Sequence, residues 1–357
     1  MDITKDFDGG NINVLKIEEN RVLLENELRD TTEEWFYWAF CVKGAQGKTI
    51  TFRFNRNARV GYYGAAVSHD LKNWIWSDTK IDDTSFSYTF GEDEDKVYFA
   101  HNMVYSYDMF LDFAKRNEIC IKTLCKSQKG RDIPYFTFGN GNKKVVLTAR
   151  HHACESTGNY VLQGFVEALL KNLPKDYLFL CVPFVDFDGV VDGDQGKSRA
   201  PHDHNRDYDL TKPAIYNSVA EIRKFCENNN VVFGFDFHSP WHTGGRNDRN
   251  FIPKKSIIKL KKINKFAELL EKNNTEDAMA YHCKYDVEPN TFWNKVGTPC
   301  FASIVCDNPY SEFAFTLETA YFGVEDAKFS QQRAVNLGNN TARTFVEYIS
   351  TVGCSRE

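Results

Sequence analysis

The residues best suited to chemistry follow a short apolar segment. Residues 145–149 have the composition of a buried strand, and His151, His152 and Glu155 come soon after it. In α/β enzymes, such a strand presents polar groups at the carboxyl edge of a sheet. Because His152 and Glu155 are three residues apart, an imidazole and a carboxylate can converge on one metal ion as the chain turns. Taken alone, the pair also fits a solvated loop, since an H-x-x-E pattern arises by chance.

A second candidate ligand, His238, follows another apolar segment. Residues 231–237 read as a buried strand, so His238 is expected at its carboxyl end, on the same edge of the sheet as His152. Asp236 precedes it by two residues and therefore points to the same face, where a carboxylate can orient an imidazole. The alternative for His238 alone is a histidine that caps the strand end through backbone hydrogen bonds.

Residues 182–208, between these candidates, are rich in Gly, Asp and His and lack helix or strand periodicity. A loop of this length inside a compact domain is usually functional or disordered. It carries Arg199, Asn205 and Arg206. One guanidinium group can bind a carboxylate through two parallel hydrogen bonds, and a second can stabilise charge on a carbonyl oxygen. The alternative is a solvated, charged loop.

Glu318 is the last candidate. It ends an apolar segment, residues 313–317, and Ala320 follows soon after. A carboxylate in an apolar site beside a metal ion can act as a general base towards a water molecule. The alternative is a strand-end acid that caps a helix.

The elements that must position these residues fall into two parts. Residues 1–104 contain short aromatic and β-branched segments separated by Gly, Asn and Asp, which predicts an antiparallel β-sandwich domain. In residues 105–357 strands alternate with helices, which predicts an α/β domain with a mixed, largely parallel sheet and helices on both faces. The aromatic residues 35–40 are interpreted as the core of a central strand rather than as a binding surface.

The order of elements in the second part follows from the apolar pattern. Strands are predicted at residues 121–125, 145–149, 178–182, 231–237, 301–306 and 313–317. Helices are predicted at residues 106–116, 157–173, 214–226, 257–272 and 331–349. Ser106 is the expected N-cap of the first of these helices.

Composition narrows the class of protein. The net charge is −5 and Lys and Arg are spread along the chain, which argues against nucleic acid as a partner. No apolar run is long enough to cross a membrane, and residues 1–20 are polar and acidic rather than signal-like. The ten cysteines form no C-x-x-C pair, so we expect reduced thiols in a cytoplasmic protein.

The order of these motifs resembles the zinc carboxypeptidase family over about residues 105–350. The shared layout is H-x-x-E, then an Asp-Gly-rich loop with Arg and Asn-Arg, then D-x-H and finally T-L-E. KGRDIP at 129–134 and FTLETAYFG at 315–323 also match. FDGGN at 7–11 and WFYWAF at 35–40 resemble the β-sandwich that precedes the catalytic domain in the cytosolic carboxypeptidase subfamily.

The resemblance implies a metallocarboxypeptidase that hydrolyses the C-terminal peptide or isopeptide bond of a peptide or protein tail. It implies one Zn²⁺ bound by His152, Glu155 and His238, with a position left open for water. His151 is a rival for the first position, but only His152 has the family's offset from Glu155.

The resemblance also assigns roles to the other candidates. Glu318 matches the general base that takes a proton from the water and passes it to the leaving amine. Arg206, with Asn205, matches the group that binds the terminal carboxylate of the substrate. Arg199 matches the arginine that polarises the scissile carbonyl.

The chain departs from the relatives that trim glutamate chains. Those relatives carry an Arg after a Gly-Thr pair, whereas here Pro299 and Cys300 follow the pair and Lys295 is the nearest preceding cation. Ser303 is expected to line the side-chain pocket without a charge. The sequence therefore does not predict specificity for a C-terminal Glu.

Two other functions fit the same residues. One is a zinc-dependent deacylase of small N-acyl amino acids, and the other is a non-catalytic binding module on a peptidase scaffold. The assisting tyrosine of many relatives cannot be assigned among Tyr281, Tyr285 and Tyr310. The oligomeric state is left open.

Overall fold

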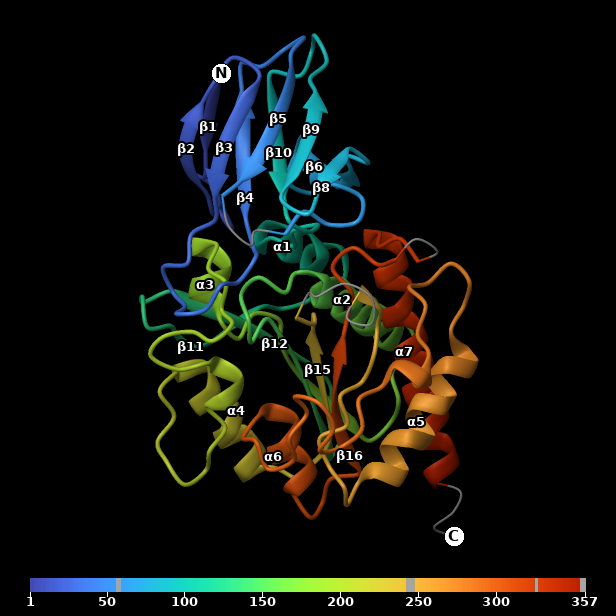
Figure 1. The fold of residues 1–357 in the computed structure, drawn as a ribbon. Coiled ribbons are helices and arrows are strands. Elements are labelled where there is room, and N and C mark those ends of the chain that lie inside the picture. The colour runs from blue at the N-terminus through green and yellow to red at the C-terminus, as the bar shows by residue number, and fades with distance from the viewer. Residues whose placement is uncertain (56–58, 242–247, 325–326, 354–357) are drawn as a thin grey trace.

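The computed structural model describes residues 1–55, 59–241, 248–324 and 327–353 (Figure 1). The N-terminal part contains ten strands: β1 (Asp2–Thr4), β2 (Asn13–Ile17), β3 (Arg21–Glu25), β4 (Ala39–Lys43), β5 (Thr49–Phe54), β6 (Ala66–Ser68), β7 (Ile75–Trp76), β8 (Lys80–Asp82), β9 (Ser85–Thr89) and β10 (Lys96–Ala100). They form two five-stranded sheets, in the orders β1-β4-β10-β6-β7 and β2-β3-β5-β9-β8.

These two sheets confirm the predicted β-sandwich. Ile50, Phe52 and Phe54 alternate with more exposed residues along β5 and point into a core that both sheets share. Phe40 of β4 enters the same core from the other sheet, as the interpretation of residues 35–40 predicts. All strand pairs are antiparallel except β3 with β5, which is parallel.

The second part contains one six-stranded sheet, in the order β11-β12-β14-β13-β15-β16. Its strands are β11 (Lys122–Lys126), β12 (Asp132–Gly139), β13 (Lys143–Ala149), β14 (Tyr177–Val182), β15 (Val231–His238) and β16 (Phe313–Glu318). The four strands β14, β13, β15 and β16 are parallel, whereas β11 and β12 are antiparallel. The predicted mixed, largely parallel sheet is therefore confirmed.

The register of this sheet brings the candidate residues together. Thr148 of β13 pairs with Asp236 of β15, and His238 of β15 pairs with Glu318 of β16. Because the three strands are parallel neighbours, their carboxyl ends meet at one edge of the sheet.

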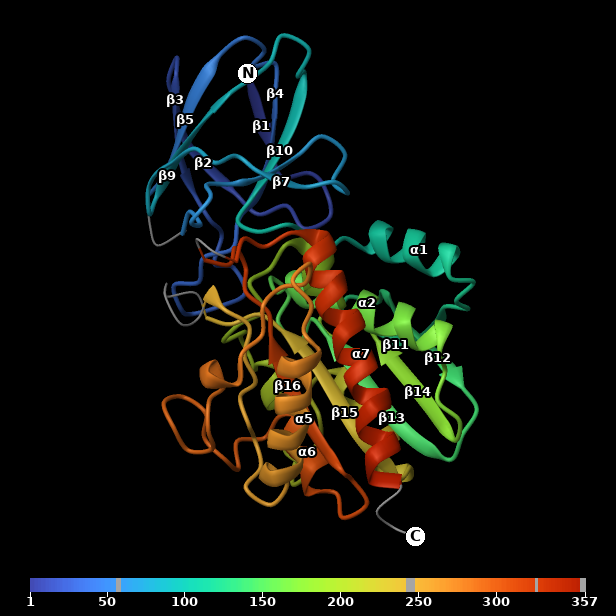
Figure 2. The ribbon, with the colours of Figure 1, turned by 90° about the vertical axis from the view of Figure 1, so that its right-hand side faces the viewer.

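Seven α-helices surround the sheet: α1 (Tyr107–Arg116), α2 (Thr157–Lys171), α3 (Phe187–Asp192), α4 (Asn217–Asn228), α5 (Leu260–Asn273), α6 (Phe301–Asp307) and α7 (Gln331–Gly353). Figure 2 shows α7 running along the sheet with α2 and α5 beside it. Phe235 of β15 packs against Phe165 of α2 and Phe345 of α7. The neighbouring Gly234 points to the opposite face, where Phe301 of α6 packs so closely that an added Cβ would lie 3.0 Å from its ring.

Two helices differ from the prediction. Residues 301–306, expected as a strand, form α6, because a short buried apolar run fits either element and the local cap decides. At that cap, the backbone N–H of Cys300 donates to Ser303 Oγ at 2.9 Å. Residues 187–192 form α3, whose N-cap Asp186 accepts from the backbone N–H of Gly189 at 3.0 Å. With six residues, this helix is too short for its apolar residues to show helical periodicity.

No helix within the described residues has both the length and the apolar character that a membrane crossing needs.

Candidate active site

A buried arginine shapes the loop that follows β13. Arg150 adopts a left-handed backbone conformation with φ of 59°. Its guanidinium group donates to the carbonyl oxygens of Ala153, at 2.7 Å, and Tyr105, at 3.0 Å. These bonds offset the cost of that conformation, about 1 kcal/mol or more for a residue other than glycine. The turn returns His152 and Glu155 to the carboxyl edge of the sheet.

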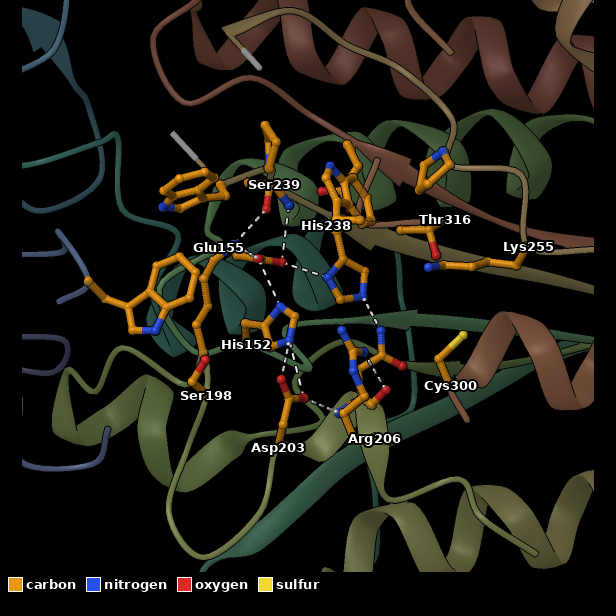
Figure 3. Close-up of a pocket in the computed structure, with 18 residues that line it drawn as sticks. His152, Glu155, Ser198, Asp203, Arg206, His238, Ser239, Lys255, Cys300 and Thr316 are labelled. Atoms are coloured by element: carbon orange, nitrogen blue, oxygen red, sulfur yellow. Dashed lines mark hydrogen bonds and ion pairs between the residues drawn. The ribbon is translucent and has the colours of Figure 1, made fainter. Parts of the chain in front are cut away.

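The three candidate ligands His152, Glu155 and His238 meet at this edge (Figure 3). Glu155 lies between the two imidazoles: its Oε1 is 2.9 Å from His152 Nδ1 and its Oε2 is 2.7 Å from His238 Nδ1. The three donor atoms lie within 4.8 Å of one another and face a cavity. Two imidazole nitrogens and a carboxylate, with one open side, are the donor set of a catalytic zinc ion, so these residues fit zinc.

The outer nitrogen of each imidazole contacts a further carboxylate. His152 Nε2 lies 3.2 Å from Asp203, and His238 Nε2 lies 2.8 Å from Asp236. Although burial opposes the effect, His152 lowers the pKa of Asp203, and the neighbouring histidines lower that of Asp236. Both carboxylates therefore stay charged and direct the Nδ1 atoms towards the cavity.

A second group of potential ligands lies deeper. His151, Asp236 and His238 also bring donor atoms within 4.8 Å of one another. His151 Nδ1 is 2.9 Å from Asp236, and its Nε2 is 2.7 Å from the hydroxyl of Tyr208, so both ring nitrogens have partners. His151 is fully buried and does not border the cavity. We therefore place His151 behind the cavity.

Glu318 lies beside these groups at the end of β16. It is almost fully buried, and its Oε2 atom has no hydrogen-bond partner within the described part of the chain. Burial raises the pKa of this carboxyl group. Glu318 also borders the cavity, so a carboxylate oxygen is free to accept a proton from a molecule bound there.

The cavity has a volume of about 330 Å³ and contains the other candidate groups. Asn205 and Arg206 border it, and Arg206 Nη1 donates to the carbonyl oxygen of Asn205 at 2.8 Å. Asn205 is held by α6, because its Oδ1 accepts from the backbone N–H of Phe301 at 3.1 Å. Among the described residues, no carboxylate forms an ion pair with Arg206. Its guanidinium group is therefore available for an anionic ligand.

Arg199 is not brought to this cavity. Its guanidinium group lies among three carboxylates, at 2.6 Å from Asp186, 3.0 Å from Asp194 and 3.6 Å from Asp30. Arg199 does not border the cavity.

Lys197 does reach the cavity, and the sequence did not single it out. Its Nζ atom is 2.5 Å from Glu155 Oε1 and donates to the carbonyl oxygen of Ser239 at 3.0 Å. The loop has no helix or strand periodicity, so the sequence does not indicate whether Lys197 or Arg199 reaches the cavity.

The far side of the cavity carries another unexpected charge. Figure 3 shows Lys255, Cys300 and Thr316 grouped opposite Ser198. Ser303, expected there, lies instead inside the cap of α6, and its hydroxyl group donates to the carbonyl oxygen of Cys300. Ser303 therefore does not border this cavity, whereas the cation Lys255 does.

None of the three candidate tyrosines borders the cavity. Tyr281 is fully buried and its hydroxyl group contacts Asp286, whereas Tyr310 borders a different cavity. The structure does not assign an assisting tyrosine.

Comparison with known proteins gives two adjacent family matches. The model of the "Cytosolic carboxypeptidase N-terminal domain" matches residues 3–102, and that of the "Zinc carboxypeptidase" family matches residues 107–255. Each of the two parts of the chain is thus similar to a part of the zinc carboxypeptidases. This family uses one zinc ion, in agreement with the donor set at the sheet edge.

Individual relatives agree with the family. The chain is 25% identical to cytosolic carboxypeptidase 2 of Xenopus tropicalis over 298 residues, which is 74% of this chain but 30% of that protein. It is 31% identical to human cytosolic carboxypeptidase 2 over 176 residues, covering 42% of this chain and 20% of the human protein.

Solved structures share the whole fold. A metallo-carboxypeptidase from Burkholderia cenocepacia has a TM-score of 0.79 and is 19% identical, with 98% of this chain and 99% of that chain covered. A metallo-carboxypeptidase from Pseudomonas aeruginosa has a TM-score of 0.80 and 20% identity over the same shares of the two chains.

Proposed function

We propose that the protein is a zinc-dependent metallocarboxypeptidase that releases the C-terminal residue of a peptide or protein tail. One observation supports this most strongly: two imidazoles and a carboxylate converge on the cavity beside Glu318, which has a free oxygen. Zinc bound by His152, Glu155 and His238 would polarise the scissile carbonyl and lower the pKa of a water molecule.

The chain's own groups carry out the remaining chemistry. Glu318 takes a proton from the water as its oxygen bonds to the carbonyl carbon, and the carbonyl oxygen becomes negatively charged. When the carbon–nitrogen bond breaks, Glu318 returns that proton to the leaving amine. Arg206, helped by Asn205, holds the terminal carboxylate and so fixes which bond lies at the reaction centre.

The side-chain pocket supports a preference for an acidic C-terminal residue. Lys255 borders the cavity, and burial lowers the pKa of its ammonium group. Its nitrogen lies 5.2 Å from the centre of the Trp293 ring, and among the described residues no carboxylate forms an ion pair with it. An anionic side chain would replace the hydration that the ammonium group has lost, so we propose that Glu or Asp binds beside Lys255.

The function is tested with peptides that differ only in their last residue. We expect the zinc-loaded protein to release a free amino acid, faster from a peptide ending in Glu than from one ending in Leu or Lys. No amino acid release from any peptide would refute the proposed function. Release with the same kcat/KM for all three would refute only the acidic preference.

Variants separate the roles in this site. Glu318→Gln should bind zinc normally and lose at least about 100-fold in kcat, because general-base catalysis contributes about that much. Arg206→Ala should raise KM for peptides with a free carboxylate but not for amidated ones. Lys255→Met should remove the preference for Glu and leave cleavage after apolar residues intact.

We also propose a cytoplasmic location and assign Arg199 a role in holding its loop. The nine described cysteines are free thiols, which fits a reducing compartment. Cell fractionation tests the location.

Arg199→Lys should lower thermal stability more than the activity of the folded protein.

A further inference from the structure

Lys197 brings a cation to the candidate zinc site. Its side chain is 7% exposed, and its ammonium group contacts Glu155, a candidate zinc ligand. It also donates to the carbonyl oxygen of Ser239 at 3.0 Å and borders the same cavity as Glu318. The ammonium group therefore lies at the metal site, on the same cavity as the proposed general base.

The path of the backbone brings Lys197 there. Gly196, with φ of +75°, packs against the loop of the zinc ligands, where an added Cβ would lie 2.1 Å from the backbone nitrogen of Ala153. Only glycine fits this approach, because any side chain would clash with the backbone. The carbonyl oxygen of Gln195 also accepts from the backbone N–H of Cys154 at 3.2 Å.

The N-terminal part of the chain fixes this loop from the other side. The Asp30 carboxylate accepts the backbone N–H groups of Gln195, at 3.0 Å, and Gly196, at 2.8 Å. The Gln195 side chain binds backbone groups of Tyr37 at 2.8 and 2.9 Å. The ring of Trp35 lies 5.3 Å from the Lys197 nitrogen and borders the same cavity.

We propose that Lys197 is a catalytic residue whose ammonium group stabilises the negative charge formed on the carbonyl oxygen of the scissile bond. Asp30 is a positioning residue that keeps it there. This inference rests on the proposed carboxypeptidase function. It gives Lys197 the role that the resemblance assigns to Arg199, whose guanidinium group is already surrounded by carboxylates. The interaction is electrostatic, transfers no proton and needs no further reactant.

The proposal makes the N-terminal part a component of the active site. The segment between β3 and β4, which belong to different sheets, supplies Asp30 and Trp35. A cation that acts on the transition state requires fixed geometry, since small displacements cost large factors in rate.

The test compares Lys197→Met, Lys197→Arg and a control, Lys212→Met, at an exposed lysine. For each zinc-loaded variant we would measure kcat, KM, zinc content and the affinity for a phosphinate peptide, which carries negative charge where the carbonyl oxygen would be. We expect Lys197→Met to lose about 100-fold in kcat and in phosphinate affinity, with little change in KM and zinc content. Lys197→Arg should recover part of both losses, and the control should match the native protein.

Other outcomes overturn the proposal. If Lys197→Met keeps its kcat, or binds the phosphinate as tightly as the native protein, Lys197 does not stabilise the developing charge. If it loses zinc and activity together, Lys197 supports only the metal ligand Glu155. An inactive native protein would instead refute the proposed function itself.

Asp30→Asn keeps the test informative even if Lys197→Met does not fold. It retains the side-chain shape but replaces one acceptor oxygen by an amide donor that faces a backbone N–H. We expect about a 10-fold loss in kcat with KM and zinc content unchanged. A native kcat in this variant would show that Asp30 does not position Lys197.

Discussion

Carboxylates hold both imidazoles of the candidate zinc site in place. Asp203 contacts His152 from a loop, whereas Asp236 contacts His238 from within β15. Asp203→Asn keeps the shape of the side chain but removes its charge, so zinc affinity should fall by about 10- to 100-fold. Competition with a chelator measures this change. The control is Asp209→Asn, at an acid that bonds only to nearby Thr211 and Lys212, and equal zinc affinity in the two variants would contradict the role of Asp203.

His204 makes the stability of this loop depend on pH. Its ring stacks on Tyr216 with a centroid distance of 3.5 Å, and burial lowers its pKa from 6.5 to about 4. Between these two values the unfolded chain binds more protons than the folded protein. The contribution of His204 is thus fully present above pH 6.5 and is lost as the pH falls towards 4.

The size of this effect can be bounded. Each pH unit between the two pKa values is worth about 1.4 kcal/mol, so the loss is about 3 kcal/mol at most. His204→Leu cannot titrate, and urea unfolding at several pH values should show a smaller loss of stability on acidification. Parallel curves for the native protein and the variant would contradict the assignment.

At the scale of elements, the close contact between β15 and α6 fixes the position of α6, whose N-cap residue Cys300 borders the active-site cavity. Gly234→Ala would place its Cβ 3.0 Å from both Ala314 and the Phe301 ring, so α6 must shift. We expect a loss of about 1–3 kcal/mol in the free energy of unfolding, as for other overpacked cores. Urea unfolding measures it, with Gly91→Ala as the control, because only the flexible Asp93 side chain lies as close as 3.0 Å there. Equal stabilities would show that α6 adapts freely.

The sequence predicts the elements whose apolar residues form a clear pattern. It does not predict those in which a local contact determines whether a helix or a strand forms. The strands before His238 and Glu318 are recognisable because they are continuous apolar runs that end in a polar residue. The run at residues 301–306 is equally apolar, but its cap at Cys300 makes it a helix. Propensity alone does not separate these two outcomes.

The same limit applies to the candidate site. His152, Glu155, His238 and Glu318 are predictable because strand ends place them at one sheet edge. Lys197 and Lys255 lie in segments without a period, and their positions depend on contacts with distant residues such as Asp30 and Trp293. Sequence spacing contains no information about those contacts, and Arg199 was the more prominent cation.

At the scale of the whole molecule, the β-sandwich has its own core, and a second apolar cluster joins it to the α/β part. Phe36 packs against Tyr321 with a centroid distance of 5.4 Å, and Trp76 Nε1 donates to the carbonyl oxygen of Phe329 at 2.9 Å. Phe36 and Trp76 belong to the same buried cluster as the sheet residues of the α/β part. A large apolar interface favours joint unfolding over independent motion.

We therefore expect the two parts to unfold in one transition, although residue 104 remains the predicted boundary between them. Every α-helix of the described residues lies in the α/β part, whereas four of the six tryptophans lie in residues 1–104. Far-UV circular dichroism and tryptophan fluorescence thus report mainly on different parts, and their urea midpoints should coincide. Residues 105–357 expressed alone would expose the surfaces around Tyr321 and Phe329 and should lose cooperative unfolding. Two separate midpoints, or cooperative unfolding of the isolated α/β part, would show that the α/β part folds without the β-sandwich.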